Sequence, residues 1–160
     1  MRHGVGMTDQ VADQALAILG ANRYAVIGTA SPAGEPWVSP VYFGYRGLGT
    51  LLWLSRPSSW HSRLIAGNDR IAVTVFDSTV VMGAASAYYA RASAEICSDA
   101  ELADHLAAFS EQSVERGFPA WRVDQVTGDA ALRLYRAEVS EAWLLPVEDG
   151  PERRIPLPLR

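Results

Sequence analysis

Three β-forming segments follow one another between residues 23 and 55, and this run constrains the fold more than any other feature. The segments RYAVIGTA (23–30), WVSPVYFGY (37–45) and TLLWLS (50–55) are rich in β-branched and aromatic residues. They are separated by SPAGEP and RGLG, which contain the proline and glycine of tight turns. Short turns of this kind join antiparallel strands. Pro40 lacks the N–H group that a paired strand needs, so we expect an edge or a bulge there.

The rest of the chain adds three more strand patterns and three helical ones. The segment 121–129 fits no single element. About six strands in clustered hairpins predict a mainly β (α+β) fold, a small six-stranded antiparallel barrel with peripheral helices. Strands are predicted over 70–76, 85–97 and 131–145, the last with a bulge at 140–141, and helices over 8–20, 58–66 and 98–117.

The third predicted helix begins with the capping box SDAE at 98–101. Helical spacing places Leu102, Leu106 and Phe109 on one apolar face. His105 stands one residue before Leu106, and we expect it to face solvent.

Composition and charge limit the class of protein. The 160 residues, 49% hydrophobic and 20% charged, suffice for a single packed domain over 1–160, with loose ends at 1–7 and 147–160. The net charge is −4 and all 14 basic residues are arginine, so nothing favours binding to nucleic acid or to an anionic membrane. No apolar run is long enough to span a bilayer, and the first residues lack the apolar segment of a secretory signal. A cytoplasmic location is therefore expected.

Cysteine and histidine are too few and too scattered for a metal site. Cys97 is the only cysteine, and the three histidines stand far apart without the spacing of metal ligands. We therefore expect neither an intrachain disulfide nor a structural metal. The sequence also lacks a hydrolase elbow and a carboxylate pair spaced for acid–base catalysis.

The segment LLWLSRPSSWHSRL is the strongest candidate for a ligand site. An apolar strand stops at Ser55, and a helix is expected to begin at one of the two serines that follow Pro57. The Arg56 guanidinium, the Ser59 hydroxyl, His61 and the N–H groups of the first helical turn could then converge. Such a mixture of donors suits a phosphate. An ordinary capped helix beside an exposed arginine explains the same residues equally well.

In this order, the segments resemble the flavin-binding split-barrel family related to pyridoxamine 5′-phosphate oxidase. The resemblance covers 8–145 and rests on a leading helix followed by YAVIGTASPAGEPWVSPVYFGY, GTLLWLS, SSWHSRLIAGND and RIAVTVF. It implies an FMN-binding split barrel and a homodimer with two flavin sites at the subunit interface. It also implies an oxidoreductase that acts on a small-molecule substrate with FMN as its cofactor.

Carried over by position, the resemblance assigns the candidate segment to the cofactor's phosphate. Arg56, Ser59 and His61 would be the phosphate ligands, and Ser55 would lie near the ribityl chain or the ring edge. Members of the family often have lysine where this sequence has His61. Histidine is less fully charged than lysine at neutral pH.

The resemblance also implies which residues meet the isoalloxazine ring. The second strand would offer mainly backbone groups, and an aromatic residue would approach from the second subunit. The strand residues are Val38, Ser39, Pro40 and Val41, and the aromatic candidates are Trp143 and Tyr88.

Other members of the fold class leave alternative functions open. The segment PVEDGPERRIPLPLR has no counterpart of the basic, aromatic C-terminal segment with which pyridoxamine 5′-phosphate oxidase grips its substrate, so that reaction is not expected. Some relatives bind a deazaflavin coenzyme, which would make this protein a reductase that uses that donor. Other relatives bind haem. A non-catalytic flavin-binding protein is the third alternative.

Overall fold

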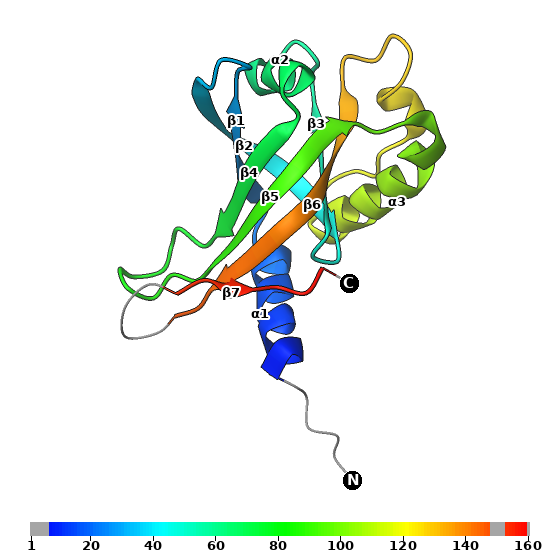
Figure 1. The fold of residues 1–160 in the computed structure, drawn as a ribbon. Coiled ribbons are helices and arrows are strands. Elements are labelled where there is room, and N and C mark those ends of the chain that lie inside the picture. Colours follow the sequence, from blue (N-terminus) through cyan, green and yellow to red (C-terminus); the bar gives the residue numbers. More distant parts are fainter. Residues whose placement is uncertain (1–6, 148–152, 160) are drawn as a thin grey trace.

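The structure, a computed structural model, describes residues 7–147 and 153–159 (Figure 1). None of the helices in these residues has the length and apolar character that a membrane crossing requires. The elements are α1 (Met7–Ala21), β1 (Tyr24–Ala30), β2 (Pro36–Arg46), β3 (Thr50–Ser55), α2 (Trp60–Gly67), β4 (Arg70–Phe76), β5 (Ala87–Ile96), α3 (Asp99–Glu115), the 3-10 turn η1 (Val123–Gln125), β6 (Arg133–Leu145) and β7 (Ile155–Pro156).

Six strands close into an antiparallel barrel, as the sequence predicted. The strand order is β3-β2-β1-β4-β5-β6-β7, and an additional pairing joins β3 to β6. In that closing pair, Thr50 lies opposite Glu138 and Ser55 lies opposite Arg133. The short strand β7 pairs with β6 on the edge opposite to β5. Helix α2 lies at one end of the barrel and α3 packs outside it (Figure 1).

Strand β2 changes partner halfway along its length, which leaves one of its edges free at Pro40. Residues 36–42 pair with β1, whereas pairing with β3 begins at Phe43. The Phe43 N–H donates to the Arg23 carbonyl at 3.2 Å, and this bond shows which residues of β2 direct their backbone groups toward β1. Because bonding alternates along an antiparallel strand, Val38 and Pro40 direct their backbone groups away from β1. Proline thus occupies an edge position where no ladder bond is lost, which confirms the prediction.

The predicted bulge in the last long strand is also present. Arg91 of β5 lies opposite Glu141, whereas the next residue, Ala92, lies opposite Val139. Ser140 is therefore the extra residue on β6, and its hydroxyl donates to the Arg91 carbonyl at 3.2 Å. Such an extra residue bends and twists the strand, which helps a small sheet to close.

Alternation along β3 divides the interior into two cores. Leu51 and Trp53 point into the barrel, where the Trp53 ring stacks on Tyr135 with centroids 5.6 Å apart. Leu52 and Leu54 point to the opposite side, into a second core beneath α3. The predicted apolar face of α3 fills that second core with Leu102, Leu106 and Phe109, all buried.

The prediction that His105 faces solvent is wrong. His105 is only 8% exposed, and its Nδ1 lies 3.3 Å from Nη1 of Arg46 in β2. Helical spacing within α3 could not show this contact, because Arg46 stands 59 residues earlier in the chain.

The predicted loose end at 147–160 is ordered over 153–159. In β7, Ile155 lies opposite Leu144 and Pro156 lies opposite Trp143. Leu157 is 8% exposed and belongs to the barrel core. The remaining parts of the predicted loose ends, 1–6, 148–152 and 160, lie outside the described residues.

Candidate functional site

The end of β3 and the start of α2 bring the side chains of Ser55, Ser59, His61 and Ser62 together. Ser55 is the last residue of β3 and follows Leu51 and Trp53 on the inward face of the strand, and the residue is only 8% exposed at the barrel end. Helix α2 begins at Trp60, with Ser59 as its N-cap in extended backbone conformation. Four residues, 56–59, separate β3 from α2, and among them is Pro57, whose fixed φ stiffens the connection.

Hydrogen bonds connect these side chains into a network that is centred on Ser55. Its Oγ lies 2.9 Å from Ser59 Oγ and 2.8 Å from His61 Nε2. Ser62 is buried, and its hydroxyl donates to the same Ser55 oxygen at 3.4 Å. Ser59 in turn donates to the Arg56 carbonyl at 2.7 Å. The sequence interpretation named all of these residues except Ser62, which stands three positions after Ser59 and therefore shares its helix face.

The geometry requires one tautomer of His61. Because the Ser59 hydrogen goes to a carbonyl, which can only accept, the bond between Ser59 and Ser55 must use the Ser55 hydrogen. Ser55 then has no hydrogen left for the imidazole, so Nε2–H of His61 donates to Ser55. The Nδ1 atom carries the lone pair of the neutral ring.

Burial favours the neutral form of His61. Desolvation lowers the pKa of His61 below its ordinary value. Protonation at Nδ1 would add a second donor without breaking the bond from Nε2 to Ser55. A nearby anion would favour that protonated form and raise the pKa again.

The start of α2 adds further donors for an anion. The first N–H groups of a helix have no partner within the helix, and the helix dipole makes this end positive. Ser59 leaves these groups free, because its side chain bonds back to Arg56 instead of capping the helix. Arg56 itself is exposed and forms no ion pair within the described part of the chain.

The free edge of β2 lies beside this cluster. The rings of Trp37, in β2, and Trp60, the first residue of α2, meet edge to face with centroids 6.2 Å apart. Of the four strand residues named from the sequence, Val38 and Pro40 have backbone groups on the free edge. The other two face β1: Ser39 accepts a 3.1 Å bond from the Trp37 indole, and the Val41 side chain is buried in the core.

The two aromatic candidates occupy different surroundings, and neither meets the cluster in the same chain. Tyr88 is fully buried and its hydroxyl donates to the Leu48 carbonyl at 2.8 Å, so it cannot reach a ring bound on another subunit. Trp143 is partly exposed near the far end of β6, under the Arg91 guanidinium. Ten residues of strand separate it from Arg133, the partner of Ser55, a distance of about 33 Å along the strand.

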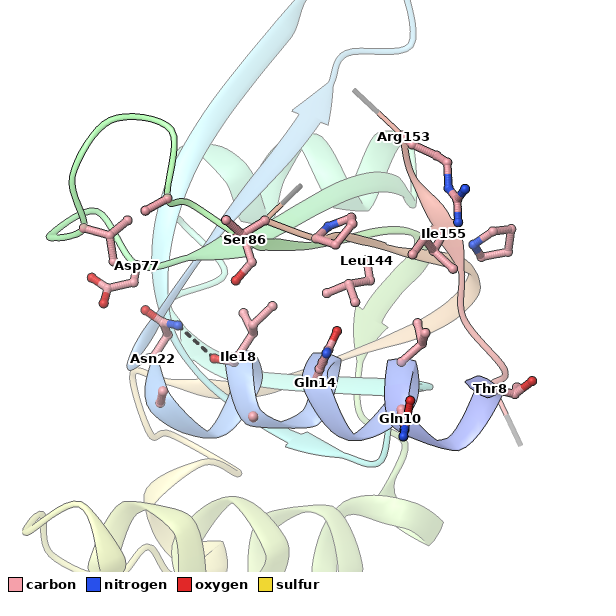
Figure 2. Close-up of a pocket in the computed structure, with 18 residues that line it drawn as sticks. Thr8, Gln10, Gln14, Ile18, Asn22, Asp77, Ser86, Leu144, Arg153 and Ile155 are labelled. Atoms are coloured by element: carbon pink, nitrogen blue, oxygen red, sulfur yellow. Dashed lines mark hydrogen bonds between the residues drawn. The ribbon is translucent and has the colours of Figure 1, made fainter. Parts of the chain in front are cut away.

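A large cavity of about 780 Å³ lies away from this cluster, along α1 (Figure 2). Helix α1, the segment after β4 and the strand β7 form its walls, with Ile18, Leu144 and Ile155 among its apolar residues. Asp77 and Arg153 stand on opposite sides of it (Figure 2). Asp77 is engaged by Thr79, whose N–H and hydroxyl donate to the same carboxylate oxygen. None of the residues proposed for the cofactor lines this cavity.

The closed six-stranded barrel, with a polar cluster between β3 and α2, defines the chain as a split-barrel protein. The model of the pyridoxamine 5′-phosphate oxidase family matches residues 11–145, and the chain therefore belongs to that family. A comparison with curated proteins found no match.

Solved structures with the same fold have names that refer to different cofactors. A haem-binding protein from Mycobacterium smegmatis superposes with a TM-score of 0.70 at 17% identity, over 91% of this chain and 57% of that one. An FAD-binding protein from Mesorhizobium loti gives 0.62 at 18% identity, over 83% and 92% of the two chains. An F420 reductase gives 0.56 at 19% identity, over 79% and 93%. At these identities the likeness shows the fold alone.

Proposed function

We propose that this protein is a cytoplasmic, homodimeric oxidoreductase that binds FMN. The observation that carries the proposal is the hydrogen-bonded cluster of Ser55, Ser59 and His61, with Arg56 beside it at the start of α2. Membership of the pyridoxamine 5′-phosphate oxidase family supports a flavin as the ligand.

The cluster matches what a terminal phosphate needs. Arg56 supplies a permanent charge and a fork of donors, and the first turn of α2 supplies N–H groups. Protonated His61 would add an Nδ1 donor. Ser55 is held by three hydrogen bonds, so its part is to fix the orientation of His61 and Ser59.

The free edge of β2 would hold the ring of the cofactor. Val38 offers an N–H and a carbonyl there, and Pro40 offers a carbonyl. When bound, the flavin supplies the redox chemistry, while the chain binds and orients it. The chain leaves apolar side chains exposed around this edge, with Trp37 at 49%, Val38 at 66% and Trp60 at 57%, which supports a subunit interface over the site. Trp143 would then reach the ring from the second subunit.

A deazaflavin coenzyme is the second candidate, and the charge of the cluster supports it. Burial lowers the pKa of His61 and so favours its neutral form. Arg56 is then the only permanent cation among the proposed ligands, which are Ser55, Arg56, Ser59 and His61. One positive charge suits a singly charged phosphodiester as well as it suits a phosphate monoester. Haem has less support, because the groups around His61 are hydrogen-bond donors that suit an anion rather than an iron ion.

Titration with FMN and riboflavin tests the phosphate assignment. Riboflavin lacks the phosphate, so wild-type protein should bind FMN more tightly than riboflavin. Arg56→Ala should weaken FMN binding by about 1.5–3 kcal/mol, roughly 10- to 150-fold, and leave riboflavin binding unchanged. The matched control is Arg153→Ala, which removes the same charge beside β7, away from α2 (Figures 1 and 2).

Two results would contradict the proposal. Equal FMN affinity in Arg56→Ala and wild type would remove Arg56 from the site. Uptake of a deazaflavin coenzyme without measurable FMN binding would favour the second candidate. Sedimentation tests the assembly separately, and a stable monomer that retains FMN would refute the shared interface.

A further inference from the structure

The two ring nitrogens of His61 lie in different surroundings. Nε2 lies 2.8 Å from Ser55 Oγ. Nδ1 has no hydrogen-bond partner in the described part of the chain, yet it is not among the buried side-chain atoms that lack a partner. Nδ1 is therefore open to solvent, although the His61 residue as a whole is partly buried. A ligand at the start of α2 can thus meet this ring at Nδ1.

The neutral ring presents a lone pair at Nδ1, and the network around Ser55 fixes it there. A hydroxyl group can donate one hydrogen bond and accept two. Ser55 donates to Ser59 and accepts from His61 and from the buried Ser62, so its capacity is fully used. Ser55 has no hydrogen to give to Nε2, and the proton of the neutral ring therefore stays on Nε2. Neutral His61 offers a ligand an acceptor and no donor.

This acceptor conflicts with a terminal phosphate. Above its second pKa of about 6, a phosphate monoester carries two negative charges and offers only acceptor oxygens. A lone pair that faces another lone pair forms no hydrogen bond. One proton at Nδ1 removes the conflict, because it supplies the missing donor and leaves the bond from Nε2 to Ser55 in place. The ring is therefore complementary to the dianion only after it has taken up a proton.

No acidic group in the strands packed against α2 holds such a proton before a ligand binds. Helix α2 packs mainly against β1, β2 and β5, and Glu95 is the only carboxylate in these three strands. Glu95 is ion-paired with Arg136, and Asp69, which follows α2, accepts a bond from the Ser93 hydroxyl. Burial is the one cause that acts on the pKa of His61, and it lowers that pKa. The ring is therefore neutral at pH 7.5 until an anion binds.

The other charged groups around α2 are arginines, which disfavour a further positive charge when no anion is present. Arg133 lies opposite Ser55, and its guanidinium donates to the carbonyls of three residues in the segment before β6. Tyrosine side chains, of which β1, β2 and β5 have several, are neutral at pH 7.5. A dianionic phosphate would therefore be the first negative charge beside His61. The remaining arginines are Arg46 and Arg91 in the strands and Arg56, Arg63 and Arg70 near the helix.

On the basis of the FMN site proposed above, we propose that FMN binds together with one proton, which comes from solvent and joins Nδ1 of His61 to a phosphate oxygen. The complex then holds one proton more than the separate protein and dianionic FMN. By linkage, the affinity for FMN decreases as the pH rises. His61 thus makes retention of the cofactor sensitive to pH near neutrality.

Isothermal titration calorimetry at pH 7.5 in Mops, Hepes and Tris counts the protons, because a buffer that supplies a proton adds its own heat of ionisation to the measured enthalpy. We expect wild-type protein to take up about 0.5–1 proton per FMN, since a close anion strongly favours the protonated ring. The dissociation constant should rise about 3- to 10-fold per pH unit between pH 7 and 8.5. Riboflavin, which lacks the phosphate, should bind without proton uptake.

Two replacements of His61 separate the effect of the proton from that of the side chain's size. His61→Gln keeps a hydrogen-bonding side chain that cannot be protonated, so it should bind FMN without proton uptake and without pH dependence over this range. His61→Lys is charged throughout the range, so it should also bind without uptake, but more tightly than His61→Gln. The matched control is His105→Gln, in α3 outside the barrel, which should keep the wild-type proton uptake (Figure 1).

The possible failures are distinguishable. Tight FMN binding by the wild type without proton uptake would overturn this proposal and leave the FMN site intact. Proton uptake that persists in His61→Gln would also overturn it, because the proton would then be held elsewhere. Failure of the wild type to bind FMN at any pH would refute the proposed function, and this proposal with it.

Discussion

Gly44 of β2 allows α3 to approach the barrel, and replacing it with alanine should push the helix away. A Cβ atom at Gly44 would lie 3.0 Å from Phe109 Cδ2, 3.3 Å from Gln112 Oε1 and 3.5 Å from Phe109 Cα. Gln112 cannot rotate away without losing two hydrogen bonds, because its amide accepts from the Tyr45 N–H at 3.1 Å and donates to the Tyr45 carbonyl at 2.6 Å. The new methyl group must therefore displace α3 itself.

Two opposing terms set the expected size of this effect. Overpacking a buried contact costs about 1–3 kcal/mol. Replacing glycine with alanine at an ordinary φ returns about 0.4–1 kcal/mol, because the unfolded chain loses freedom. The difference between the middles of the two ranges is roughly 1.3 kcal/mol, and we expect Gly44→Ala to lower the free energy of unfolding by about that much, or about 3–5 °C in melting temperature for a chain of this size.

Gly28→Ala is the matched control, since it makes the same change in the neighbouring strand β1. Its Cβ would meet nothing closer than 3.7 Å, an ordinary contact with Ala72. We expect this variant to be neutral or up to about 1 kcal/mol more stable. Urea unfolding at fixed protein concentration, followed by tryptophan fluorescence, measures both variants as shifts in midpoint at constant slope. Wild-type stability in Gly44→Ala, or an equal loss in Gly28→Ala, would refute the steric reasoning.

Three further predictions concern protons, the C-terminal segment and the thiol. Burial lowers the pKa of His61 and of His105, so the unfolded chain takes up protons first as pH falls below about 6.5. The urea midpoint should therefore decrease as the pH is lowered from 7 to 5, and it should decrease less when both histidines are replaced by glutamine. An equal decrease in the wild type and in this variant would contradict the prediction. Leu157→Ala should cost about 2–5 kcal/mol of unfolding free energy, because Leu157 is buried in the barrel core; a loose segment would show no cost. Burial raises the pKa of the Cys97 thiol to about 11, so Ellman's reagent at pH 8 should react slowly until urea is added; the rate of a free thiol in the folded protein would disprove this.

Local signals in the sequence were enough to predict much of the barrel. Pro40 signals an edge because it lacks an N–H group, and Ser140 interrupts an alternating pattern, so both could be found without knowing the partners. The closure of the sheet is different. Thr50 and Glu138 pair across nearly ninety residues, and neither side chain indicates the other. The pairing follows from the resemblance and from the structure, not from a pattern.

The C-terminal segment contains two sequence signals that lead to opposite predictions, its proline content and its alternating apolar residues. Ile155, Leu157 and Leu159 alternate with two prolines in a segment rich in proline and arginine, a composition that favours a loose end. Alternation is also the pattern of a strand, and proline is tolerated on an edge strand such as β7. Whether the edge of β6 was free to accept this strand could not be known before the barrel was closed.

The sequence predicted the part of the candidate site that depends on residues close together in the chain. Ser55, Arg56, Ser59 and His61 stand next to a strand end and a helix start, so their convergence could be expected from the sequence. The tautomer of His61 depends on which hydroxyl donates to which oxygen, and this follows from the three-dimensional arrangement of Ser55 and Ser59, not from their order in the sequence.

The pairing of β3 with β6 also affects how the protein is made. Strand β3 has one partner, β2, until β6 is synthesised, so its other edge stays open while residues 56–145 emerge. At about 5–20 residues per second, this interval lasts roughly 5 to 20 seconds. An open apolar edge can pair with another nascent chain. Production of this protein should therefore benefit from lower temperature and from chaperones that occupy nascent chains, which protect the barrel before it closes.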